Sequence, residues 1–111
     1  NTVRAMSKSF GTFLRRTRKH KKLTQRALAS EVGINFTYLS KVENDVPGFS
    51  SLSEPTLEKL ADALDVDPDE MISRAGKIPS DVRQVLVDDF SLVKEIRARK
   101  KADDGSTGGS Q

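Results

Sequence analysis

The stretch from Gln25 to Asn44, QRALASEVGINFTYLSKVEN, constrains the fold more than any other part of the sequence. Gly33 predicts the end of one helix, because Gly adopts the positive φ of a helix C-terminus at little cost. Asn35 can cap the next helix, and Ala29 is small where the two helices would cross. Apolar residues recur where crossed helices would share one core: Leu28, Val32, Ile34, Leu39 and Val42. The stretch therefore predicts two short helices joined by a tight turn.

The second helix of this pair would keep an outer face that the shared core does not use. Phe36, Thr37, Ser40 and Lys41 lie on that face. A helix that is held rigidly by a partner, with a free polar face, can enter a DNA major groove. A plain helical hairpin without a nucleic-acid role is the alternative that the pattern leaves open.

The register resembles the helix-turn-helix of the phage repressor/Cro-type (XRE) family of bacterial DNA-binding regulators. The residues that carry the resemblance are Gln25, Ala29, Gly33, Leu39 and Val42, with support from Leu28 and Ile34. It extends from about Phe10 to Ile72. The resemblance implies an all-α fold, a five-helix repressor-like helix-turn-helix domain with a short C-terminal helical extension.

Caps and apolar spacing predict helices over about 10–20, 25–32, 36–43, 54–64 and 67–76, each preceded by a capping side chain. Further helices are expected from Ser80 to Asp88 and from Phe90 to about Lys101. On this basis the chain divides into a flexible arm (1–9), a helix-turn-helix DNA-binding domain (10–76), a C-terminal helical extension (77–102) and a disordered tail (103–111). Residues 43–54 are expected to form a loop.

The family resemblance implies that the helix over 36–43 reads bases, through Phe36, Thr37 and Lys41. Thr37 can hydrogen-bond a base or touch a thymine methyl, and Lys41 can donate to guanine O6 or N7, or to a phosphate. Phe36 departs from the polar residue common in the family. It either packs on a thymine methyl or folds back onto the protein.

Other residues are expected to position the protein on the phosphate backbone: Gln25, Arg26, Tyr38, Ser40, Asn44, Ser51 and Lys22. Gln25 lies at a helix N-terminus, where an anion is favoured, and the resemblance also gives it a role in supporting the recognition helix. Tyr38 is either a phosphate contact or part of the core edge. The resemblance further implies a structural ion pair between Arg18 and Glu43.

Charge is distributed unevenly along the chain. Residues 1–30 hold nine Lys or Arg and no Asp or Glu, whereas residues 31–76 hold three basic and ten acidic residues. The basic block leads directly into the helix pair, which favours a polyanionic partner over the alternative of a solvated helix face.

Composition excludes several kinds of chemistry. The chain has no Cys and a single His, His20, so a disulfide framework, a thiolate zinc site and a Ser-His-Asp triad lack their residues. We expect no enzyme activity, no metal and no cofactor, and we interpret the acidic Asp67, Asp69 and Glu70 as a helix start. No apolar run reaches the roughly 20 residues of a membrane span. A cytoplasmic, nucleoid-associated protein is expected.

The C-terminal extension is rich in apolar residues for its length: Val82, Val85, Leu86, Phe90, Leu92, Val93 and Ile96. They either cap the five-helix core or form a homodimer seam, and both readings stay open here. The resembled family commonly dimerises so that two recognition helices meet half-sites roughly 34–36 Å apart.

These observations predict a sequence-specific double-stranded DNA-binding transcriptional regulator, a repressor that binds an inverted repeat as a homodimer. The alternative is an antitoxin-like protein-interaction module of the same fold, which binds a partner protein and also represses its own operon. An RNA-binding protein is disfavoured, because the sequence has no aromatic stacking platform.

Overall fold

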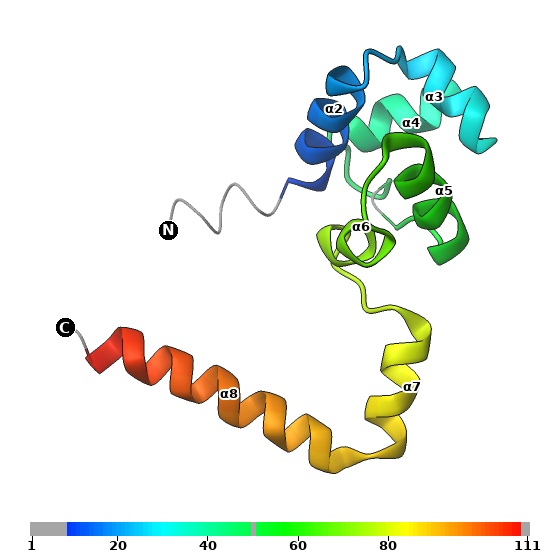
Figure 1. The fold of residues 1–111 in the computed structure, drawn as a ribbon. Coiled ribbons are helices and arrows are strands. Elements are labelled where there is room, and N and C mark those ends of the chain that lie inside the picture. The colour runs from blue at the N-terminus through cyan, green and yellow to red at the C-terminus, as the bar shows by residue number, and fades with distance from the viewer. Residues whose placement is uncertain (1–8, 50, 110–111) are drawn as a thin grey trace. The chain divides into compact units, whose positions relative to one another are not determined.

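The computed structural model describes residues 9–49 and 51–109, and every regular element within them is a helix (Figure 1). Because these residues form seven helices and no strand, the predicted all-α class is confirmed. Contacts divide the chain into two compact units, one that ends at Pro79 and one that begins at Ser80. Each unit is described by itself. The predicted arm, apart from Ser9, lies outside the described residues.

The first three helices of the first unit have the predicted bounds: α2 (Phe10–His20), α3 (Gln25–Val32) and α4 (Phe36–Glu43). Each begins at a side-chain cap. Ser9, Thr24 and Asn35 accept hydrogen bonds from backbone N–H groups that have no partner inside the helix. Gly33 ends α3 with a φ of 76°, the left-handed conformation that the sequence predicted.

Helices α5 (Glu54–Leu64) and α6 (Pro68–Arg74) complete this unit and pack against each other. Ser53 and Asp67 are their caps, as predicted. Asp65 ends α5 with a φ of 62°, a role more often filled by Gly. Helix α3 contacts both α4 and α5, and α2 contacts α4, so α4 is held from two sides.

One hydrophobic core fills the first unit. Its buried members are Phe10, Leu14, Leu28, Ala29, Val32, Leu39, Val42, Leu52, Leu57, Leu60, Ala61, Leu64, Met71 and Ile72. Ala29 is 2% exposed, as expected for the residue at the crossing of α3 and α4. Leu52 was not predicted as a core residue. It is buried because the loop between α4 and α5 folds back over the core instead of extending into solvent.

The second unit consists of α7 (Ser80–Asp88) and α8 (Phe90–Gly109), which contact each other. The sequence placed the end of the last helix at about Lys101 and predicted a disordered tail at 103–111. The structure differs in the length of this helix, because α8 continues to Gly109. Gly105, Gly108 and Gly109 are residues that often end a helix, and α8 continues through them. Each residue added to an existing helix gains a backbone hydrogen bond without a new nucleation cost.

Candidate nucleic-acid interface

Helix α4 presents an outer face above a buried inner face. Leu39, Val42 and Glu43 are buried, whereas Thr37 and Lys41 are exposed and Ser40 is half-buried. Asn35 accepts hydrogen bonds from the backbone N–H groups of Thr37 and Tyr38, at 2.7 and 3.3 Å, so the first turn of α4 is fixed. The structure thus places Thr37 in the open on a rigid helix.

A buried ionic network fastens α4 to the two helices before it. Arg18 donates to both carboxylate oxygens of Glu43, at 2.6 and 2.9 Å, and to the carbonyl oxygen of Leu23. Gln25 Nε2 donates to Glu43 Oε1 at 2.9 Å. Arg15 Nε approaches the same oxygen at 3.7 Å. Since both partners of the Arg18–Glu43 pair are buried, it joins α2 to α4 with little screening by water, and Gln25 adds α3 to the network.

Gln25 therefore ties the start of α3 to the last residue of α4 through its side-chain amide. Its position at the N-terminus of α3 leaves backbone N–H groups for an anion. The phosphate contact itself stays a prediction.

A second fastening, which sequence reasoning missed, joins the start of α2 to the end of α4. Gly11 is buried. A Cβ atom at this position would lie 2.5 Å from the carbonyl oxygens of Glu43 and Val42. The backbone N–H of Gly11 donates to Asp45 Oδ1 at 3.1 Å, and Ser9 Oγ donates to Asp45 Oδ2 at 2.8 Å. A Gly inside an amphipathic helix was the available signal, since such a Gly often has a packing reason.

At the N-terminal end of α4, Phe36 is half-buried and packs against the core. The guanidinium carbon of Arg26 lies 4.2 Å from the centroid of the Phe36 ring. Of the two alternatives left open for Phe36, this geometry matches folding back onto the protein. Its aromatic face holds an exposed cation of α3 beside α4.

At the C-terminal end of α4, Phe49 forms a cluster with two predicted DNA-contact residues. Its ring centroid lies 5.8 Å from that of Tyr38, and Lys41 Nζ lies 4.8 Å from the Phe49 centroid. Tyr38 and Phe49 are both half-buried and pack against the core. Phe49 is not among the predicted site residues, because the loop conformation that brings it back to α4 has no local periodicity.

The remaining residues predicted to contact phosphates differ in whether their side chains already make hydrogen bonds within the protein. Asn44 is exposed, but its side chain donates to Ser40 O at 2.8 Å and accepts from Arg15. Lys22 and Ser51 are both exposed. Lys22 has a φ of 60° in the turn between α2 and α3. Lys22 therefore lies before α3, Asn44 at the C-cap of α4 and Ser51 in the loop that follows.

Of the three acidic residues interpreted as a helix start, Asp67 is the cap of α6, and Asp69 and Glu70 lie in its first turn. Asp67 Oδ1 accepts from the N–H groups of Asp69 and Glu70, at 2.7 and 3.3 Å, and Glu70 pairs with Arg74 at 3.0 Å. Within the described residues, no group of three or more His, Cys, Asp or Glu side chains has the arrangement of a metal site.

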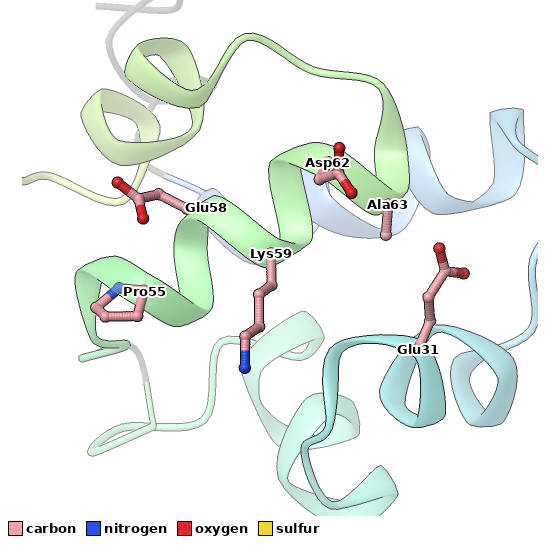
Figure 2. A pocket seen from close by; sticks show the side chains of 6 residues that line it. All are labelled: Glu31, Pro55, Glu58, Lys59, Asp62 and Ala63. Carbon is pink, nitrogen blue, oxygen red and sulfur yellow. The ribbon is translucent and has the colours of Figure 1, made fainter.

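A shallow groove of about 310 Å³ lies between α3 and α5. Its lining residues are Glu31, Pro55, Glu58, Lys59, Asp62 and Ala63. Figure 2 shows Glu31 extending from α3 toward the side chains of α5. The groove is open and mostly lined by charged, exposed side chains. Among the helices that the structure describes, none combines the length and the apolar character needed to cross a bilayer.

Comparisons with known proteins agree with this geometry. The model of the family HTH_3, described as helix-turn-helix, matches residues 14–71, which run from within α2 to within α6. The HTH-type transcriptional repressor RghR of Bacillus subtilis (strain 168) is 36% identical over 70 residues, which cover 63% of this chain. The chain spans half the length of that relative.

Two solved structures have similar folds. The biofilm master regulator SinR in complex with DNA matches with 29% identity and a TM-score of 0.50, over 56% of this chain and 95% of its own. A chain of the SinR protein/SinI protein complex matches with 25% identity and a TM-score of 0.51, over 92% of this chain and 99% of its own. The second match extends beyond the first unit into α7 and α8.

Proposed function

Because this chain belongs to the helix-turn-helix family of XRE/Cro-type DNA-binding regulators, which are not enzymes, we propose that it is a transcriptional repressor that binds an inverted repeat in double-stranded DNA as a homodimer. The observation that carries this proposal is the exposure of Thr37 on a helix that a buried ion pair and two neighbouring helices hold rigid. Such a helix can enter the major groove without reordering.

Positioning on DNA is the task of residues around α4 that reach phosphates. Lys22, Arg26, Asn44 and Ser51 are exposed, and the N-terminus of α3 at Gln25 attracts an anion. These contacts set the register of the protein on the duplex but carry no sequence information.

Sequence would then be read by few side chains. Thr37 is the best placed, because it is exposed in the first turn of α4. Lys41 lies one turn further along and can donate to guanine O6 or N7. Phe36, whose ring already holds Arg26, is assigned to orienting that cation and not to base contact.

Dimerisation is assigned to the second unit. Val82, Val85, Phe90 and Ile96 are 45–72% exposed, which leaves apolar surface for another chain. Leu86, Leu92 and Val93 are half-buried. On this proposal residues 10–76 contact DNA, and the segment from residue 77 forms the dimer. The cytoplasmic, nucleoid-associated location is part of the same proposal.

The test is selection of bound sequences from random duplex DNA at a stated salt concentration, since phosphate contacts make affinity strongly salt-dependent. The proposal expects a palindromic motif whose half-sites are about one helical turn apart. Recovery of a single half-site would contradict the dimer, and recovery of no motif would contradict sequence-specific binding.

A second candidate function has one observation in its favour. The match that covers 92% of this chain comes from a complex of two proteins. An antitoxin-like module would bind a partner protein through the exposed apolar residues of α7 and α8 and still repress its own operon. A stable heteromeric complex purified from the native host, without homodimers, would favour this function over the lone repressor.

A further inference from the structure

The loop after α4 turns back sharply at Pro47 and Gly48. Phe49 N donates to Val46 O at 3.1 Å, and Gly48 has a φ of 89°. Pro in the second position of a turn and Gly with positive φ in the third is the pattern of a type II turn. Val46 N in turn donates to Lys41 O at 3.0 Å, which ties the turn to the last helical residues. The backbone hydrogen bonds of this turn therefore fix the position of Phe49.

The turn delivers the Phe49 ring to one face of α4. Tyr38 and Lys41 are three residues apart, so they are neighbours on the helix surface. The ring packs against Tyr38 at a tilt of 60°, and Lys41 Nζ lies over its face at 4.8 Å from the centroid. Tyr38 supports one side of the ring while the ammonium group occupies its face.

This contact restricts where the Lys41 ammonium group points. An unrestrained Lys is a charge on a flexible four-carbon stem, able to reach phosphates as well as bases. An aromatic face attracts the cation, while the N–H donors that point away from the ring stay available for a base acceptor. Prior ordering of the side chain also reduces the entropy that DNA binding would cost.

We propose that Phe49 is a positioning residue for DNA sequence recognition, which holds the Lys41 ammonium over its ring and thereby sets the base pair that Lys41 prefers. The inference rests on the proposed function, because it requires that α4 reads DNA. It assigns part of the specificity to a loop residue outside the helix-turn-helix motif.

The first experiment tests the contact in the free, full-length chain. Ring currents of Phe49 should shift the Lys41 Hε resonances upfield from those of exposed lysines in NMR spectra. The shift should disappear in Phe49→Leu and persist in Phe49→Trp, which keeps an aromatic face. Lys41 Hε resonances at the position of exposed lysines in the unmodified chain would overturn the proposal.

The second experiment measures dissociation constants for the selected DNA site and for variants of each base pair. Lys41→Ala identifies the base pair that Lys41 reads, because at that base pair the variant no longer distinguishes the selected base from the others. At that pair Phe49→Leu should reduce discrimination about twofold to fivefold, the range of an exposed cation–π contact. Phe49→Trp should retain the preference. Lys41→Ala/Phe49→Leu should discriminate there no worse than Lys41→Ala alone.

Phe13→Leu is the matched control, because Arg74 lies 4.4 Å from the centroid of the Phe13 ring in a cation–π pair that does not involve α4. It should leave the base preference unchanged. An equal loss of affinity at every base pair in Phe49→Leu would mean a merely structural role and would overturn the proposal. If Phe49→Leu does not fold, Phe49→Met removes the ring with less loss of volume.

Failure of the inference and failure of the proposed function are distinguishable. A selected motif with an unaltered preference in Phe49→Leu ends the inference alone. Absence of any motif from the unmodified chain ends the proposed function, and the inference with it, even where the NMR shift is present.

Discussion

At the scale of single residues, the close approach of α2 to α4 depends on Gly11. The space beside its Cα is occupied by backbone oxygens of Val42 and Glu43, which cannot rotate away as a side chain can. The same approach lets Asp45 accept a hydrogen bond from Gly11 N. One hydrogen atom in place of a side chain thus permits two helices to meet.

We expect Gly11→Ala to destabilise the first unit by about 1–3 kcal/mol, the usual cost of overpacking. The higher helix propensity of Ala, worth about 1 kcal/mol, offsets part of this cost. The destabilisation is measured as the difference in the free energy of unfolding in urea between the variant and the unmodified chain. Arg16→Ala, at an exposed position of the same helix, is the control and should change stability by less than about 0.5 kcal/mol. Equal stability of both variants would contradict the tight approach.

Arg18 and Glu43 form the other residue-scale constraint, because removal of the guanidinium leaves a carboxylate buried without its main partner. Arg18→Met should cost about 3–5 kcal/mol in the free energy of unfolding. The double variant Arg18→Met/Glu43→Leu should recover part of this loss, since it removes the stranded charge as well. A double variant less stable than Arg18→Met would show that packing and not charge dominates at this site.

At the scale of elements, the start of α4 decides how firmly Thr37 is presented. Asn35 occupies the N-cap and holds two backbone N–H groups of the first turn, those of Thr37 and Tyr38. Thr24 performs the same task for α3, accepting from Ala27 N at 3.0 Å. The two caps are chemically similar but only one belongs to the helix that would read bases.

Asn35→Ala should therefore cost about 1 kcal/mol of stability and also accelerate amide hydrogen exchange at Thr37 and Tyr38. The affinity of Asn35→Ala for DNA should fall by more than the affinity of a variant that lacks the cap of α3. Thr24→Ala is the matched control, with a similar loss of stability and unchanged exchange at Thr37. Equal losses of DNA affinity in the two variants would contradict a role of the first turn of α4 in DNA recognition.

At the scale of the whole molecule, the two units differ in how much apolar surface they expose. The first unit buries most of its large apolar residues in one core, whereas the second leaves Val87 and Phe90 68% and 72% exposed. An exposed apolar face of this kind favours association with another chain. The proposed inverted-repeat binding needs that association, since one α4 reads only one half-site.

Phe90→Asp should shift the chain from dimer to monomer in sedimentation velocity, because a charge buried at an interface without a partner is costly. Binding to a full inverted repeat should weaken far more than binding to a half-site. Ala98→Asp introduces the same charge at an exposed position of α8 and should leave the dimer intact. A Phe90→Asp variant that remains dimeric would place the interface elsewhere.

Local signals in the sequence determined most of the element boundaries. Ser9, Thr24 and Asn35 cap helices that begin at the next residue, and Gly33 ends α3, because a cap and the groups it bonds lie within three residues. The crossing at Ala29 followed from residue size and spacing. The outer face of α4 followed in the same way, since it is what the apolar pattern leaves over.

Only the tertiary structure decided which side chains on and around that face are already engaged. Gly11 meets Asp45 across 34 residues of sequence, and Phe49 reaches Lys41 through a turn that no period encodes. Helix α8 is likewise longer than predicted, because it continues past Gly105, a residue type that often ends a helix. Contacts between distant segments depend on the path of the whole backbone, which local spacing does not contain.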